Sequence, residues 1–270
     1  FVAFKVPNLF RRLFAEGAFA SALVPVLRTA DREGGPDALR RLIASLSGVL
    51  GAILLLFTFA GILAASWLIL VFAPGFAFEP HQQALAAELL RLTFPYVLCI
   101  VLAALAGSVL NLHEVFGVPA FTPVLLNLAI IGSAIWLSPC LQEPILALGW
   151  GVLLGGLAQL PFQLPFLARL GLLPLPRLAW QHPGTRQILH RLGPVLLGVS
   201  VTQINLLLDT FLASFLAVGS ISWLYYSDRL VEFPVGVLGA ALGTVILPRL
   251  ARQGSSWSAD GTSQEAFSRT

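Results

Sequence analysis

The chain has 270 residues, of which 57% are hydrophobic and 11% are charged, and its formal net charge is +3. An ordinary soluble domain has about 25% charged residues, so this composition and a mean hydropathy of +0.86 exclude that class and indicate a membrane protein. The small positive charge comes without a dense basic block, so no nucleic-acid partner is expected.

Apolar runs predict seven membrane helices, because one crossing needs about 20 mostly apolar residues. The first is expected over residues 4–27, with interruptions near Pro7 and Pro25. The other six are expected at residues 42–73, 82–113, 115–142, 144–168, 185–217 and 220–251. The sequence therefore predicts an all-α, polytopic membrane helix bundle. Since the chain starts at Phe1 and contains no Met, we expect a fragment, with residues 253–270 as a polar loop or truncation edge.

Arginines in the predicted connections gather on one side of this topology. Four lie within residues 28–41 and four within residues 169–191, and the last helix exits at Arg249 and Arg252. The connections at 74–81, 112–118 and 138–143 contain no Lys or Arg. By the positive-inside rule the arginine-rich side faces the cytoplasm, so the first helix runs inward.

A few charged residues remain at membrane depth, where a charge costs at least about 3 kcal/mol on insertion scales. They are Lys5, Arg11, Arg12, Glu16, Asp209, Asp228, Arg229 and Glu232. Such groups persist by facing a wet cavity or a partner. They are therefore the candidate site residues.

Helical geometry groups these charges on two helices. At 100° per residue, one stripe about 80° wide carries Lys5, Asn8, Arg12 and Glu16, and Arg11 lies beside it. On the last helix Arg229 and Asp228 stand three and four residues before Glu232.

Two interpretations of these charges remain open. Internal pairs, Arg12 with Glu16 and Arg229 with Glu232, would hold helices together. A hydrated cavity explains the whole set better, because cations on the first helix exceed acids three to one, which suits an anionic, phosphate-bearing ligand. Asp209 either hydrogen-bonds to a neighbouring helix or belongs to a coupling-ion site.

Catalytic and metal-binding motifs are absent from the sequence. It contains no HExxH, GxSxG, phosphate loop or EF-hand, and its four His form no ligand cluster. Cys99 and Cys140 lie in apolar runs without metal-ligand spacing and are expected to behave as small hydrophobes. We expect no enzyme activity, no metal and no cofactor.

Several stretches are similar to a known family. "VAFKVPNLFRRLFAEGAFASALVPVL" and "SWLYYSDRLVEFPVGVLGAALGTVILPRL" resemble the MurJ (MviN) lipid II flippases of bacteria. "APGF", "TFPY", "PAFTPVLLN" and "GPVLLGVSVTQINLLLDTFLASFLA" match that family's pattern in the same order. The resemblance covers nearly all of residues 1–252.

The resemblance implies a branch of the multidrug/oligosaccharidyl-lipid/polysaccharide exporters, with fourteen helices in two lobes around a central cavity. This chain would supply helices two to eight. Residues 1–180 would form most of the N-lobe, and residues 181–252 would form the first two helices of the C-lobe. The family's cavity arginines, which face the lipid II pyrophosphate, match Arg11, Arg12 and Arg229. Its acids match Glu16 and Glu232.

The resemblance also implies a function and a location. It predicts that lipid II, an undecaprenyl-diphosphate-linked disaccharide peptide, moves from the cytoplasmic to the outer leaflet of the bacterial inner membrane by alternating access. A sodium ion, with Asp209 as a candidate ligand, or the membrane potential would drive the cycle. Membrane lipid and cell-wall synthesis proteins are the other partners considered.

Three alternatives remain. The nearest is an exporter of another polyprenyl-diphosphate-linked glycan or of a drug, although a cationic drug would need an acidic cavity. A membrane glycan polymerase would need acids or a metal near the membrane surface, and the outer connections are short and nearly uncharged. A structural scaffold would leave the cavity cations unexplained.

Overall fold

The computed structural model describes residues 2–15, 18–173, 175–217, 219–232 and 234. Within these ranges the chain is helical apart from short connections and has no strand, which confirms the all-α class. The chain divides into two compact units, Phe1–Ala217 and Val218–Thr270, and each is described by itself.

The first unit contains eight α-helices in its described part. They are α1 (Val2–Ala15), α2 (Ala18–Leu63), α3 (Ala65–Phe72), α4 (Pro80–Thr93), α5 (Tyr96–Leu112), α6 (Gly117–Gly132), α7 (Leu146–Arg169) and α8 (Pro183–Ala213). A 3-10 turn, η1 (Pro74–Phe78), precedes α4, and a π turn and a 3-10 turn, η2 (Ser133–Leu137) and η3 (Ser138–Cys140), extend α6. The second unit has a described helix over residues 220–232.

In the part of the chain that the structure describes, four helical segments are long and apolar enough to cross a membrane. They are Phe19–Leu63, Pro80–Leu112, Gly117–Cys140 and Leu146–Arg169. Pro80–Leu112, Gly117–Cys140 and Leu146–Arg169 coincide with the third, fourth and fifth predicted crossings, and Phe19–Leu63 covers the end of the first and most of the second. Helix α8 covers most of the sixth predicted crossing. Of the seventh, residues 220–232 are described as a helix, and its part beyond residue 234 lies outside the described residues.

Prolines do not interrupt the first crossing where we expected them to. Pro7 lies inside α1 and Pro25 inside α2, because a helix whose other backbone groups are bonded can lose one N–H and continue through a local kink. The real break in α2 is at Gly35, whose φ of 66° is a left-handed conformation that favours glycine. The chain reverses there, and Pro36 opens the second arm.

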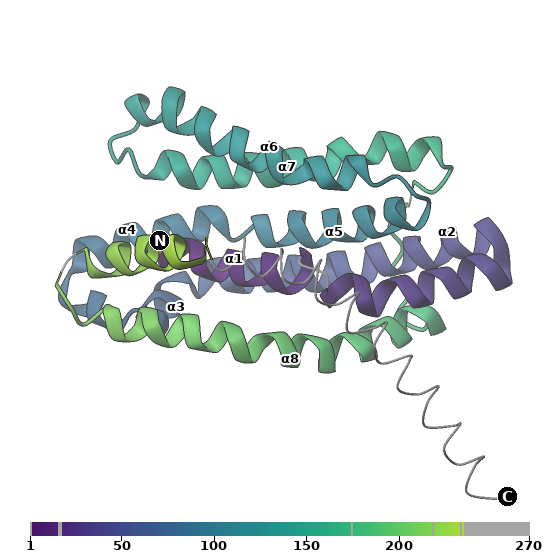
Figure 1. The fold of residues 1–270 in the computed structure, drawn as a ribbon, viewed down its shortest axis with the longest axis horizontal. Coiled ribbons are helices and arrows are strands. Elements are labelled where there is room, and N and C mark those ends of the chain that lie inside the picture. The colour runs from purple at the N-terminus through teal and green to yellow at the C-terminus, as the bar shows by residue number, and fades with distance from the viewer. Residues whose placement is uncertain (1, 16–17, 174, 218, 233, 235–270) are drawn as a thin grey trace, which may run out of the picture. The chain divides into compact units, whose positions relative to one another are not determined.

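The helices of the first unit lie side by side along one direction (Figure 1). Helices α6 and α7 form a pair that packs on α5, and α8 lies on the other side of the unit, against α2. Two buried amides fasten α7 to its neighbours: Gln159 Nε2 donates to Thr122 O at 3.1 Å on α6, and Gln163 Nε2 donates to Ala103 O at 3.1 Å on α5.

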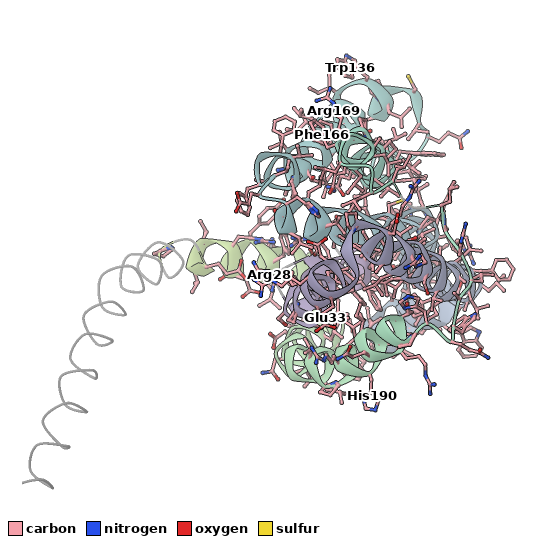
Figure 2. The ribbon with its side chains drawn as sticks, turned by 90° about the vertical axis from the view of Figure 1, so that its right-hand side faces the viewer. Arg28, Glu33, Trp136, Phe166, Arg169 and His190 are labelled. Atoms are coloured by element: carbon pink, nitrogen blue, oxygen red, sulfur yellow. The ribbon has the colours of Figure 1, made fainter. Side chains whose placement is uncertain are left out.

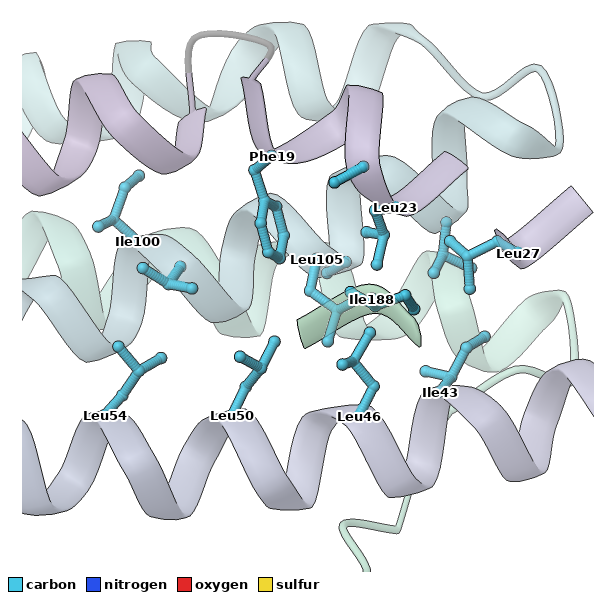
Figure 3. Close-up of a cluster of buried hydrophobic side chains, with 14 of the residues drawn as sticks. Phe19, Leu23, Leu27, Ile43, Leu46, Leu50, Leu54, Ile100, Leu105 and Ile188 are labelled. Atoms are coloured by element: carbon cyan, nitrogen blue, oxygen red, sulfur yellow. The ribbon is translucent and has the colours of Figure 1, made fainter. Parts of the chain in front are cut away.

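Both arms of α2 contribute to the apolar core, together with α5 and α8 (Figure 3). The labelled side chains are Phe19, Leu23, Leu27, Ile43, Leu46, Leu50, Leu54, Ile100, Leu105 and Ile188. Leu23, Leu27 and Ile188 are completely buried. Because lipid is as apolar as these side chains, close packing rather than burial from water holds this cluster together.

The two arginine-rich segments meet at one end of the first unit. Arg177 N donates to Ala44 O at 2.8 Å, and Ser45 Oγ donates to Ala179 O at 2.9 Å and bonds Thr185 Oγ1 at 2.8 Å. Arg28 and Arg169 are labelled in the view onto this end (Figure 2). This arrangement agrees with the predicted one-sided distribution of arginine.

Candidate ligand-binding site

Helix α1 presents an apolar face to its neighbours and a polar stripe on another side. Val2 and Ala3 are buried, and the Phe10 ring lies 4.9 Å from the Phe57 ring of α2. These contacts fix the rotation of α1. The described polar residues of the predicted stripe and the adjacent Arg11, together called the α1 stripe below, are all partly buried: Lys5, Asn8, Arg11 and Arg12.

Two cations of this stripe are held by neutral oxygen atoms. Arg11 Nε donates to Asn8 Oδ1 at 2.8 Å, one helical turn away. Lys5 Nζ donates to Thr210 Oγ1 on α8, which is 205 residues away in sequence. A hydrogen bond from a guanidinium or an ammonium to a neutral oxygen orients the cation and does not itself neutralise its charge.

In the second unit, Arg229 makes two contacts within its own helix. Arg229 Nη1 lies 2.9 Å from Glu232 Oε2, and its guanidinium carbon lies 5.3 Å from the centre of the Tyr225 ring. Both charged side chains are 48% exposed. The pairing expected between Arg229 and Glu232 is therefore present, and the exposure leaves the guanidinium accessible from one side. Asp228 is partly buried on the same helix.

The two remaining predicted site residues are Asp209 and Glu16. Asp209 is exposed on α8, next to the buried Thr210. Glu16 lies outside the described residues, so its expected pairing with Arg12 stays a prediction. Within the described ranges no group of three or more His, Cys, Asp or Glu could hold a metal ion.

Two contacts of the candidate site were missed by sequence reasoning. Tyr225 stands four residues before Arg229, a spacing at which helical neighbours meet, so the sequence did contain this signal. Thr210 carries no such signal, because its partner Lys5 comes from a distant helix.

Comparison with known proteins gives a consistent result over nearly the whole chain. The family model described as "Lipid II flippase MurJ" matches residues 1–265. A "Probable lipid II flippase MurJ" of Vibrio cholerae is 47% identical over 268 residues, 97% of this chain and 51% of that relative. A "Lipid II flippase MurJ" of Burkholderia cenocepacia is 43% identical over 256 residues, 93% and 50% of the two chains. This chain thus spans about half the length of the curated relatives it matches.

The fold agrees with the sequence match. A solved structure titled "Lipid II flippase MurJ, inward closed conformation" superposes with a TM-score of 0.75 at 27% identity, covering 92% of this chain and 50% of that one. The motifs, the helical architecture and the match over residues 1–265 lead to one conclusion: this chain is a membrane protein that belongs to the MurJ family of lipid II flippases.

Proposed function

We propose that the intact protein containing this chain moves lipid II from the cytoplasmic to the outer leaflet of the bacterial inner membrane by alternating access. The observation that supports this most is the α1 stripe, where Lys5, Arg11 and Arg12 stand in a helix that is apolar apart from these residues and Asn8. The named relatives, described as lipid II flippases, support the choice of lipid.

The chemistry of these side chains fits a diphosphate headgroup. Guanidinium groups bind phosphate oxygens through paired N–H donors, and an ammonium adds a compact positive charge. Arg11, Arg12 and Lys5 would contact the diphosphate from α1, and Arg229 from the helix over 220–232. The sugar and peptide would cross in the cavity while the lipid tail stays in the bilayer. The carrier would act as a transporter, with no covalent bond made or broken.

Return of the empty carrier needs an energy source. Moving one charge through 100 mV is worth about 2.3 kcal/mol, so a cavity with a net positive charge would respond to the membrane potential. Asp209 is the candidate residue for a sodium-coupled alternative, because it is exposed on α8 near the α1–α8 contact.

Native mass spectrometry of the intact protein tests the substrate. The wild type would receive equimolar lipid II and a polyprenyl diphosphate with a different glycan. We expect preferential lipid II adducts that are lost in Arg11→Ala and Arg229→Ala. Arg169→Ala is the matched control, because this exposed arginine at the end of α7 stacks on Phe166 at 5.5 Å, away from the α1 stripe.

Each possible result of this experiment would reject a different part of the proposal. Equal adducts of both lipids would keep a polyprenyl-diphosphate carrier and reject lipid II specificity. Adducts that survive in Arg11→Ala and Arg229→Ala would reject the headgroup contacts. Loss of adducts in Arg169→Ala as well would mean that any missing surface charge weakens binding.

A further inference from the structure

Two hydroxyl side chains at the C-terminal end of α8 accept hydrogen bonds from elements early in the chain: Thr210 in its last turn and Ser214 directly after it. Thr210 is 1% exposed and accepts a hydrogen bond from Lys5 Nζ of α1. Ser214, one helical turn later and 8% exposed, accepts from Gly75 N of η1 at 3.1 Å. The two hydroxyls thus attach the same stretch of α8 to two separate elements.

The Lys5–Thr210 contact restricts a side chain that is otherwise flexible. Lysine has a four-carbon stem with high rotamer entropy, and its ammonium carries three N–H donors. A bond to the buried Thr210 hydroxyl uses one donor and fixes the end of the stem. Thr210 itself is held in a helix whose other end is fastened to α2 through Thr185 and Ser45. The ammonium is therefore placed by a rigid element rather than by α1 alone.

Arg11 provides an independent parallel on the same stripe. Its Nε donates to Asn8 Oδ1 at 2.8 Å, which orients the guanidinium plane without neutralising it. Each of these two bonds thus orients a cation through an uncharged acceptor. A site built in this way lowers the entropy that a ligand must remove on binding, because the side chains are ordered beforehand.

We propose that Thr210 is a positioning residue of the anion site: its hydroxyl holds the Lys5 ammonium on the α1 stripe, ready for a diphosphate headgroup, and so links α8 to ligand binding. This inference rests on the proposed function. It assigns Thr210 no direct contact with the lipid, and its effect passes through Lys5.

Ser214, the residue directly after α8, offers a matched control. Ser214→Ala removes the acceptor of the Gly75 N–H and leaves the Lys5–Thr210 bond in place. Thr210→Val keeps the side-chain shape and removes the hydroxyl, whereas Thr210→Ser keeps the hydroxyl. The Ser214–Gly75 contact remains in both Thr210 variants, so α8 stays attached at that point.

The test is a double-mutant cycle on the Kd for lipid II, measured with the intact protein in nanodiscs, with thermal stability recorded for every variant. We expect Thr210→Val to raise the Kd about three- to tenfold, the cost of ordering one long side chain on binding. In a Lys5→Met background the same change should alter the Kd by less than about twofold. Thr210→Ser and Ser214→Ala should each stay within about twofold of wild type.

Three results would overturn the inference. The first is a wild-type Kd for Thr210→Val. The second is an equal loss from Thr210→Val with and without Lys5, which would show a general structural effect. The third is a Thr210→Ser variant as weak as Thr210→Val. If the wild type itself does not bind lipid II, the proposed function fails and the inference fails with it, which distinguishes that case from the other three.

Discussion

Replacing Gly48 of α2 with alanine is expected to push away the backbone of Arg177, which packs against α2 at this glycine. A Cβ at Gly48 would lie 2.3 Å from Arg177 O. Real Cβ contacts are essentially never shorter than 3.0 Å, so the backbone must move by at least 0.7 Å (3.0 − 2.3). A movement of this size directed away from α2 would stretch the bond from Arg177 N to Ala44 O from 2.8 Å to 3.5 Å (2.8 + 0.7).

The magnitude follows from three contributions. Overpacking costs about 1–3 kcal/mol, and the weakened hydrogen bond costs about 1 kcal/mol. Better helix propensity returns about 1 kcal/mol. The net loss for Gly48→Ala is therefore about 1–3 kcal/mol. Gly51 is the control on the same helix: nothing lies within 4 Å of its added Cβ, so Gly51→Ala should gain about 0.5–1 kcal/mol.

The assay heats samples to a series of temperatures and measures by size-exclusion chromatography how much protein stays monodisperse. Its readout is the midpoint, the temperature at which half of the protein is still monodisperse. We expect Gly48→Ala below wild type and Gly51→Ala at or above it. A Gly48→Ala protein as stable as Gly51→Ala would refute the close contact between α2 and Arg177.

Three further predictions concern other contacts. Gly75→Ala should lower the same midpoint more than Gly48→Ala, because its Cβ would lie 1.7 Å from Ser214 O. A smaller effect would contradict the close approach of η1 to Ser214. Gln163→Glu should lower the stability by about 3 kcal/mol or more at neutral pH, since it buries an unpaired carboxylate against the Ala103 carbonyl. Gln163→Leu should lower it by only about 1 kcal/mol. Equal midpoints for the two variants would contradict burial of this side chain. A membrane-impermeant maleimide applied from outside should label the exposed Cys140 and leave the buried Cys99 unmodified; labelling of Cys140 only after lysis would reverse the orientation.

Local sequence patterns predicted the helices well, because hydropathy and helical period depend on neighbouring residues. They were wrong about the interruptions near Pro7 and Pro25, which both lie inside helices. The backbone break at Gly35, where a positive φ and the following proline act together, falls within the connection predicted over residues 28–41. Sequence alone does not show whether a proline ends a helix or merely bends it, since packing decides that.

The candidate site shows the same division. The α1 stripe could be predicted, because Asn8 and Arg11 are three residues apart and meet on one helix. Spacing likewise predicted the contact of Arg229 with Glu232. The partner of Lys5 could not be predicted, because Thr210 reaches it through the packing of α8 on α1. The ligand-binding roles of Lys5, Arg11 and Arg229 stay predictions, as do those of Arg12, Glu16 and Asp209.

The contact of Ser45 with Ala179 and Thr185 has a consequence for the order of assembly. These partners follow Ser45 by 134 and 140 residues. At about 5–20 residues per second, the ribosome needs roughly 7–30 s to supply them after Ser45 has been made. During that interval α3 to α7 enter the bilayer. Because Ser45 lies at the arginine-rich end, its hydroxyl can hydrogen-bond to water, outside the hydrocarbon, until Ala179 and Thr185 have been synthesised. Closure of this end is thus a late step, taken after the intervening helices have been inserted.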